Sequence, residues 1–288
     1  MFLKLSNFLL ILLSVTVLFL GCSSKKHKPN LKPDVIVTPD KEFVQKALIV
    51  GVSDYAGEHD LKGINLDVDN MNNLFNSWGF DTVKLSASIN FEQKMAEYAS
   101  SLKAEDVFIL YYSGHGSYTP DTSGDEIDGQ DELIVLSDGI TNNFLLDDKV
   151  NILLNNIKAR KLIIFDSCNS GSSHKRAIRS KGIDTQIKYI PAPKSARDFA
   201  GKNSQVPNTS LGGDYLFFAA CRDDEQSLAS TNGSLFTNAF VNHVDISNSA
   251  NSIHQATWNA LKDRFNPQLS ASNENLKTST LKSFLKIN

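Results

Sequence analysis

Two periodicities of hydrophobic residues alternate along most of the chain. Continuous apolar runs, typical of strands buried on both faces, occur at 46–53, 106–112, 162–165 and 215–220, with a shorter piece at 133–136. Two mixed segments, 80–85 and 280–287, are also predicted to be strands. Between them, apolar residues recur every three or four positions, which predicts helices over 65–78, 91–102, 145–157, 235–243 and 253–265. Strands that alternate with helices indicate an α/β fold with a mostly parallel sheet and right-handed crossovers. We expect the last strand, 280–287, at an edge of that sheet.

Two of the apolar runs end abruptly in residues that can do chemistry. The run 162–165 ends at Asp166, Ser167 and Cys168, and the run 106–112 ends at a small, polar segment that contains His115. The carboxyl ends of parallel strands lie at one edge of a sheet, where open α/β folds place their ligands. We therefore expect the thiol of Cys168 and the imidazole of His115 to lie close together.

This pair suits nucleophilic catalysis by a cysteine. Such a reaction needs a thiolate, an imidazole that takes and returns a proton, and N–H donors for the oxyanion. Cys168 is the expected nucleophile, His115 the expected base, and the N–H groups of Gly116 and Cys168 the expected oxyanion donors. Taken singly, Cys168 could instead be a buried small hydrophobe and His115 a turn residue. His115 precedes Cys168 by about 50 residues, which is close to the spacing in caspases.

Two short motifs carry a more specific resemblance. Residues 111–116 (YYSGHG) and 166–171 (DSCNSG) resemble the catalytic motifs of the metacaspases, members of the caspase-like clan of cysteine peptidases. The similarity covers most of 46–288, with Asn169 in place of the usual His. It implies a caspase-like α/β fold with a mostly parallel central sheet flanked by helices. A large-subunit-like part (45–172), a linker loop (173–212) and a small-subunit-like part (213–288) would form one peptidase domain.

The resemblance also implies a pocket for a basic side chain. Asp67, Ser113 and Asp166 match positions that line this pocket in metacaspases, whereas Ile64 replaces a Cys found there in some relatives. Two carboxylates beside the nucleophile would select Lys or Arg before the scissile bond. Caspases that prefer Asp would need arginines there, and none flank the two motifs. A structural role is also compatible with the pocket role. Asp166 could cap the end of its strand, and Asp67 could place a negative charge at the N-terminus of its helix.

Metal binding is a separate question, because cysteine–histidine chemistry requires no cofactor. The loop 121–132 is rich in carboxylates, which are hard-oxygen ligands for calcium. The resemblance implies calcium ligands at Asp131, Asp147 and Asp148, but Lys175 stands at the position of a fourth ligand. A solvated acidic loop is the alternative.

The segment 169–213 has few apolar residues and several Lys and Arg. A peptidase that cuts after basic residues could cut itself there, and we expect such a cut within 172–202. Cys221 follows the run 215–220, so its thiol could pack in the core or pair with Cys168.

The composition and the N-terminal residues restrict the class of protein and its location in the cell. The 288 residues are 41% hydrophobic and 21% charged, which is ordinary globular composition, and the net charge of −3 gives no reason to expect nucleic acid. Three cysteines are too few for a disulfide framework. Residues 8–20 form an apolar core too short for a comfortable membrane span of about 20 residues. Residues 20–22 (LGC) resemble a bacterial lipobox.

The N-terminal pattern therefore predicts a signal peptide at 1–21, a lipidated Cys22 and a Lys- and Pro-rich tether over 22–44. The protein would then be lipid-anchored in the bacterial cell envelope, on the periplasmic side or at the outer membrane. An uncleaved anchor helix or a plain secretory signal is the alternative.

The sequence favours a cysteine endopeptidase that cleaves proteins or peptides after Arg or Lys. A catalytically silent caspase-like binding module is the competing function from another class. A clostripain-like or legumain-like peptidase is the competing enzyme, although the acidic pocket residues disfavour the Asn preference of legumains.

Overall fold

The computed structural model describes residues 43–86, 90–120, 129–168, 184–193, 211–223 and 225–287. The chain divides into two units, Met1–Lys41 and Glu42–Asn288, and all described residues belong to the second. The expected signal peptide, Cys22 and nearly all of the tether therefore lie outside the described residues. None of the helices described in Glu42–Asn288 is long and apolar enough to cross a membrane.

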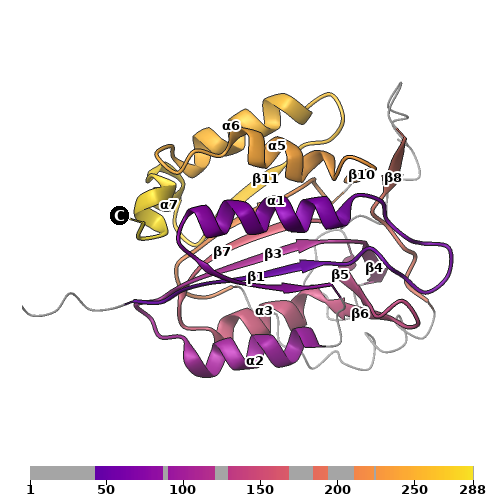
Figure 1. The fold of residues 1–288 in the computed structure, drawn as a ribbon, viewed down its shortest axis with the longest axis horizontal. Helices are drawn as coiled ribbons and strands as arrows, with labels where there is room; N and C mark the ends of the chain where they lie inside the picture. The colour runs from indigo at the N-terminus through magenta and orange to yellow at the C-terminus, as the bar shows by residue number, and fades with distance from the viewer. Residues whose placement is uncertain are drawn as a thin grey trace, which may run out of the picture. The chain divides into compact units, whose positions relative to one another are not determined.

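A six-stranded sheet forms the centre of this unit (Figure 1). Its order is β11-β9-β7-β3-β1-β2, and neighbouring strands run parallel except for the antiparallel pair β9 and β11. The strands are β1 (Gln45–Gly51), β2 (Asp81–Leu85), β3 (Val107–Ser113), β7 (Arg160–Asp166), β9 (Tyr215–Ala219) and β11 (Gln268–Ala271). The expected α/β fold with a mostly parallel sheet is thus confirmed.

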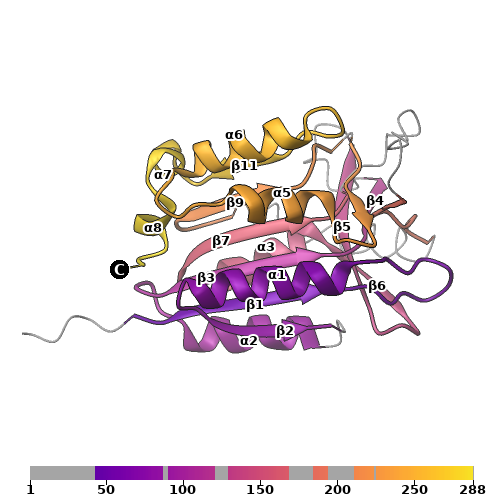
Figure 2. The ribbon, with the colours of Figure 1, turned by 45° about the horizontal axis from the view of Figure 1, so that its top comes forward.

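Helices cover both faces of the sheet (Figures 1 and 2). One face carries α1 (Ile64–Ser77), α5 (Leu235–His243) and α6 (Ala250–Leu261), and the other carries α2 (Phe91–Ser101) and α3 (Asp147–Asn156). Alternate residues of β3 feed the two cores: Ile109 packs with α1 residues such as Phe75, while Leu110 packs with α2 residues such as Met95. Every side chain of β3 is buried, which explains why its sequence is an almost continuous apolar run.

The register of the central strands aligns their carboxyl ends. Ser113 at the end of β3 pairs with Asp166 at the end of β7, and with Gly51 at the end of β1. His115 and Cys168 each follow two residues after this aligned pair. The sheet thus brings the two predicted catalytic residues to the same edge.

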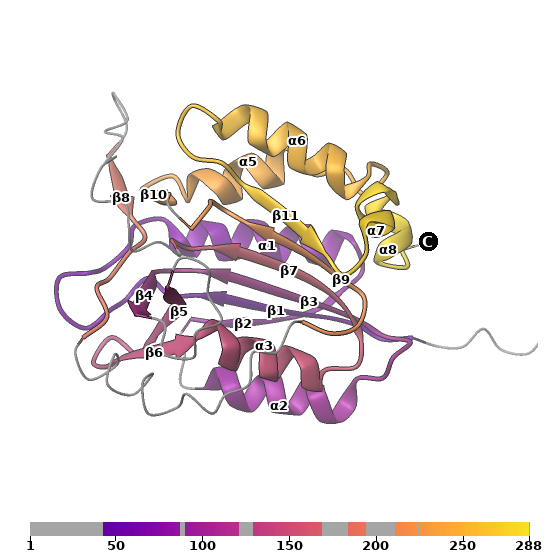
Figure 3. The same cartoon turned by 180° about the vertical axis from the view of Figure 1, so that it is seen from behind.

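Two small antiparallel sheets stand at this edge (Figures 1 and 3). One contains β4 (Gly116–Pro120), β5 (Gln130–Ser137) and β6 (Asn142–Leu146), and the other contains β8 (Thr185–Ile187) and β10 (Leu228–Ser230). Of these, the hydrophobic pattern indicated only part of β5. The others are only three to five residues long, so local pattern alone does not distinguish them from loops.

The prediction of an edge strand over 280–287 is wrong. The segment begins with the short helix α8 (Leu281–Phe284), which follows α7 (Glu274–Thr278), and the edge strand is β11. Leu281, Phe284 and Leu285 are all buried, at the spacing of three and four that a helix requires. The Thr280 hydroxyl caps α8 by accepting a hydrogen bond from the Ser283 N–H.

Candidate active site

The segments that carry His115 and Cys168 touch through their backbones. A Cβ atom on Gly116 would lie 1.6 Å from the carbonyl oxygen of Cys168, so this position has room only for glycine. Both predicted catalytic side chains are buried, with 3% of His115 and none of Cys168 exposed. The thiol of Cys168 donates a hydrogen bond to the carbonyl oxygen of Ser227, 3.3 Å away.

The imidazole of His115 has one nitrogen engaged and one without a partner. Nε2 lies 2.7 Å from the carbonyl oxygen of His59, which accepts only from a protonated nitrogen. Nδ1 is buried and has no hydrogen-bond partner among the described residues. Burial lowers the pKa of His115 from 6.5 to about 4, so the ring is neutral near pH 7. This tautomer leaves Nδ1 as the basic atom.

Tyr55 completes the support of His115. Its hydroxyl accepts a hydrogen bond of 2.7 Å from the His115 backbone N–H, and the two rings meet edge to face with centroids 4.5 Å apart. The sequence did not assign a site role to Tyr55 or His59. Only their position, shortly after the end of β1, places them near the same sheet edge.

The two predicted oxyanion donors point at one oxygen atom. The carbonyl oxygen of Lys188 accepts a hydrogen bond of 2.9 Å from the Gly116 N–H and one of 3.3 Å from the Cys168 N–H. Lys188 belongs to the segment between Cys168 and β9. The sequence predicted self-cleavage in this segment, but it did not predict that one of its residues lies in the candidate active site. The chain thus supplies its own carbonyl to these donors.

The side chain of Lys188 lies among the three predicted pocket residues. Its ammonium Nζ lies 2.9 Å from Asp166 Oδ1, 2.8 Å from the Ser113 hydroxyl and 3.9 Å from Asp67 Oδ2. It also donates to the backbone carbonyl of Asp166, at 2.9 Å. The side chains of Lys188, Asp67 and Asp166 have no exposed surface. The structure therefore brings Asp67, Ser113 and Asp166 together around a cation.

Hydroxyl and N–H groups from the C-terminal part hold the two carboxylates in place. Asp166 accepts hydrogen bonds from the Ser227 hydroxyl at 2.6 Å and from the hydroxyl and N–H of Thr237 at 2.6 and 3.2 Å. Asp67 accepts from the N–H of Ser234 at 2.7 Å, and from its hydroxyl. Ser234 and Thr237 lie in the first turn of α5, whose N-terminal dipole favours negative charge.

The buried carboxylates of Asp67 and Asp166 are stabilised by a positive charge in the pocket. Burial raises the pKa of Asp67, and the neighbouring Asp166 raises it further, whereas Lys188 lowers it. Ser227, Ser234 and Thr237 had no predicted role in the site, because they are distant in sequence from the two motifs. The available signal was Ser234 directly before the helical pattern at 235–243, where an N-cap residue is expected.

The segment around Lys188 lies extended across the sheet edge. β8 pairs antiparallel with β10, and the Lys188 N–H donates to the Ser227 carbonyl oxygen at 3.1 Å. Beyond Lys188, Tyr189 forms a parallel bridge with Gly116, and the Ile190 N–H donates to the Gly116 carbonyl oxygen at 3.1 Å. Residues 185–190 therefore follow the path of an added strand, the way an extended peptide binds to a sheet edge.

Cys221 lies near Cys168 but belongs to the core. It is buried in the hydrophobic cluster on the α1 face, and its thiol contacts the Ser167 carbonyl oxygen at 3.6 Å. A hydrogen bond with Cys168, together with burial, raises the pKa of the Cys221 thiol. Both thiols are free in this structure.

The calcium prediction remains open. Among the residues that the structure describes, no three His, Cys, Asp or Glu side chains could hold a metal ion, so Asp131, Asp147 and Asp148 do not form such a group together. Residues 121–128 and Lys175, which the prediction also involves, lie outside the described residues.

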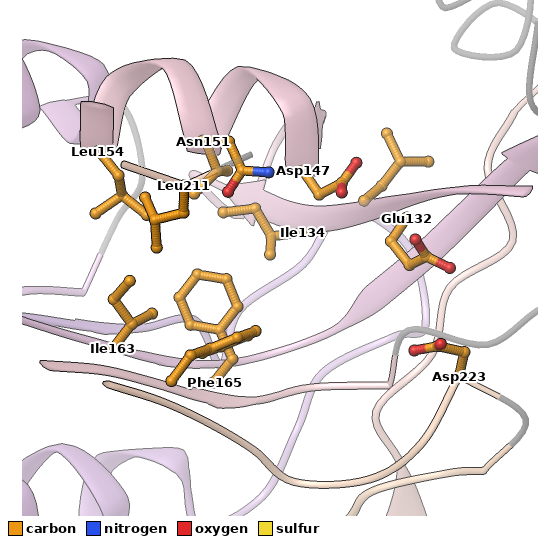
Figure 4. A pocket seen from close by; sticks show the side chains of 12 residues that line it. Glu132, Ile134, Asp147, Asn151, Leu154, Ile163, Phe165, Leu211 and Asp223 are labelled. Carbon is orange, nitrogen blue, oxygen red and sulfur yellow. The ribbon is translucent and has the colours of Figure 1, made fainter. Parts of the chain in front are cut away.

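A cavity of about 210 Å³ lies on the other face of the sheet, under α3 (Figure 4). Carboxylates of Glu132, Asp147 and Asp223 line one end, and apolar side chains that include Phe165 and Leu211 line the other. Neither His115 nor Cys168 lines it. The cavity is therefore separate from the cleft that the segment 185–190 fills.

The fold and the site define a caspase-like α/β protein with a histidine and a cysteine at the carboxyl edge of its sheet. A family profile described as "Caspase domain" matches residues 44–282. The chain belongs to this family.

Individual relatives agree with that assignment. Metacaspase-1A of Aspergillus terreus is 34% identical over 146 residues, covering 45% of this chain and 36% of the relative. Metacaspase-3 of Arabidopsis thaliana is 28% identical over 200 residues, covering 64% of this chain and 53% of the relative. The chain thus matches about a third to a half of the length of these relatives.

Solved structures show the same fold at low identity. A protein of Geobacter sulfurreducens superposes with a TM-score of 0.63 at 22% identity, covering 82% of this chain and 97% of that one. Caspase-1 of Spodoptera frugiperda superposes with a TM-score of 0.51 at 12% identity, covering 79% and 86%. The expected caspase-like fold is thereby confirmed.

Proposed function

We propose that this protein is a cysteine endopeptidase that cleaves after Lys or Arg by means of Cys168 and His115. One observation carries the proposal: Lys188 lies in the site as a substrate residue would. Its ammonium group contacts Asp166 and Ser113, while its carbonyl oxygen accepts from the Gly116 and Cys168 N–H groups. In this proposal the bond that follows this carbonyl, Lys188–Tyr189, is the scissile bond.

The proposed chemistry assigns a role to each of these groups. His115 Nδ1 takes the thiol proton of Cys168, and the sulfur attacks the carbonyl carbon, forming a C–S bond. The resulting oxyanion stays between the Gly116 and Cys168 N–H groups. The imidazolium, held through Nε2 by the His59 carbonyl, then gives its proton to the departing amine as the C–N bond breaks. Water, deprotonated by Nδ1, hydrolyses the acyl-enzyme and restores the thiol.

The charge of the pocket supports the preference for basic residues. Asp67 and Asp166 are buried, and each accepts hydrogen bonds from Ser234 or Thr237 at the N-terminus of α5. A lysine ammonium or arginine guanidinium compensates these carboxylates, whereas an Asp side chain would add a third negative charge to a buried site. The pocket therefore favours cations and excludes acids.

The position of Lys188 in the pocket suggests one specific bond for the self-cleavage expected within 172–202. We propose that the chain cuts itself first at Lys188–Tyr189. A Lys188→Ala chain should then remain intact at this bond, and a Cys168→Ala chain should remain intact throughout. Cleavage of the wild-type chain at other lysines but not after Lys188 would contradict the assignment.

The experiment that tests the proposed function uses fluorogenic peptides with Arg, Lys, Asp or Asn before the scissile bond. The purified chain is assayed under reducing conditions beside Cys168→Ala. Turnover of the Arg and Lys peptides, lost in Cys168→Ala, is the expected result. Turnover of Asp or Asn peptides would overturn the pocket assignment. Absence of all turnover from folded protein would instead favour a silent binding module.

The membrane anchor is a separate proposal, supported by the LGC motif at residues 20–22. We propose that Cys22 becomes the lipidated N-terminus and tethers the peptidase to the bacterial envelope. Metabolic labelling with an alkyne fatty acid should mark the wild-type protein but not Cys22→Ala. Equal labelling of both would contradict it.

A further inference from the structure

The side-chain amide of Gln186 is held by two backbone groups of one loop. Its oxygen Oε1 accepts a hydrogen bond of 2.8 Å from the Lys62 N–H, and its nitrogen Nε2 donates one of 2.9 Å to the Asp60 carbonyl oxygen. Gln186 lies in β8, two residues before Lys188 and therefore third before the Lys188–Tyr189 bond. The loop thus contacts both ends of the amide.

This pair of contacts fits only a side chain that both donates and accepts. A glutamate has no donor and would place its carboxylate against the Asp60 carbonyl oxygen. A methionine has nearly the same length but makes neither hydrogen bond, and an asparagine is shorter by one methylene. Because the loop uses main-chain groups, it discriminates by hydrogen-bond pattern and reach rather than by charge.

The loop is also held by contacts that do not involve Gln186. Leu61 is buried, and its N–H donates to the Ser53 carbonyl oxygen at 2.9 Å. Next to the loop, Gly63 has a φ of 77°, and a Cβ atom there would lie 2.1 Å from the Ser230 carbonyl oxygen. The loop is therefore packed closely against the end of β10, the strand that pairs with β8. A loop held by such contacts loses little freedom when it binds a peptide, which favours selective hydrogen bonding.

We propose that Asp60 and Lys62 form a subsite that selects glutamine as the third residue before the scissile bond, so that preferred substrates contain Gln-Xaa-Lys or Gln-Xaa-Arg. The inference rests on the proposed peptidase function and extends it from one residue to a short sequence. The ion pair between Lys62 Nζ and Asp184, 3.0 Å long, is largely exposed and adds little to this selection.

The test compares four acetylated tetrapeptide coumarin amides, Thr-Xaa-Ile-Lys, in which Xaa is Gln, Glu, Met or Asn. A fifth peptide, Thr-Gln-Ile-Ala, reports on the basic pocket alone. All are assayed with the detergent-solubilised full chain. The chain's own segment competes equally with every peptide, so ratios of kcat/KM are unaffected by it.

We expect Gln to exceed Met by about tenfold in kcat/KM, because each hydrogen bond to a partly exposed group contributes about two- to fivefold. Glu should fall below Met. The Lys62→Pro chain, which lacks the donating N–H, should lose most of the Gln-over-Met ratio, and circular dichroism would verify its fold. The peptide comparison itself needs no variant and stands if Lys62→Pro fails to fold.

The outcomes separate this inference from the function on which it rests. Equal kcat/KM for the four Lys peptides, with Thr-Gln-Ile-Ala uncleaved, would overturn the glutamine subsite and leave the basic-residue peptidase intact. A preference for Glu or Met over Gln would do the same. Failure to cleave any Lys peptide would overturn both.

Discussion

Lys188 and Asp166 form an ion pair of 2.9 Å in which neither side chain has any exposed surface. The carboxylate comes from the end of a central strand, and the ammonium comes from a segment that the sequence showed only as polar and basic. Burying both charges is costly unless each has partners, and here Ser113, Ser227 and Thr237 supply them. The pair holds the chain's own lysine in the pocket that the proposed function assigns to the basic side chain of a substrate.

Removing the lysine should open the site. Lys188→Ala abolishes the ion pair, so the segment 185–190 loses its anchor while Asp166 keeps its hydroxyl partners. We expect turnover of added Lys peptides to rise on the order of tenfold, because a tethered competitor acts at high effective concentration. Steady-state kinetics on wild-type chain that is still intact at Lys188–Tyr189 would measure it, with the exposed Lys84→Ala as control. Equal rates in Lys188→Ala and wild type would show that the segment does not compete.

The two pocket carboxylates should differ in importance. Asp166 lies 2.9 Å from the ammonium and Asp67 lies 3.9 Å from it. Asp166→Asn should therefore lower kcat/KM for Lys peptides by roughly 100-fold or more, and Asp67→Asn by roughly tenfold, since a closer charge contributes more. Asp166→Asn should also lower the free energy of unfolding by about 3 kcal/mol. Parallel kinetics and urea denaturation would test this, and the reverse order would contradict the distances.

Stability should depend on pH through His115. Its folded-state pKa of about 4 lies below the ordinary value of 6.5, because burial disfavours the charged ring. The stabilisation is thus complete above pH 6.5 and is lost as the pH falls toward about 4, amounting to roughly 3 kcal/mol. Urea unfolding of Cys168→Ala at pH 7.5 and pH 4.5 would measure the loss. Adding His115→Gln should reduce this loss, and an unchanged pH dependence would refute the assignment.

The close approach of the two catalytic segments should tolerate no side chain at Gly116. A Cβ atom there would overlap the Cys168 carbonyl oxygen, and the backbone would have to move the oxyanion donors. We expect Gly116→Ala to lower kcat by about 100-fold or more, the effect of losing an oxyanion donor. Gly212→Ala is the matched control, because its nearest contact would be 3.4 Å, to Asn155. Similar rates for both variants would contradict the geometry.

The sequence determined the elements with strong periodicity and the chemistry at their ends. The apolar runs that became β3 and β7 are buried throughout and could only be central strands. Parallel pairing then placed His115 and Cys168 at one edge, and the motif resemblance identified Asp67, Ser113 and Asp166. These conclusions follow from short-range pattern, because a strand's burial is visible in its own residues.

The tertiary structure decided which residues complete and fill the site. Ser234 and Thr237 reach the carboxylates because α5 packs beside α1, and Ser227 reaches Asp166 from the position directly before β10. No local pattern reports these contacts. Several Lys and Arg residues lie between Cys168 and β9, yet only long-range pairing of β8 with β10 puts Lys188 in the pocket. Polar, three-residue strands carry no periodicity to reveal their partners. Their pairing depends on the surface that the rest of the fold creates.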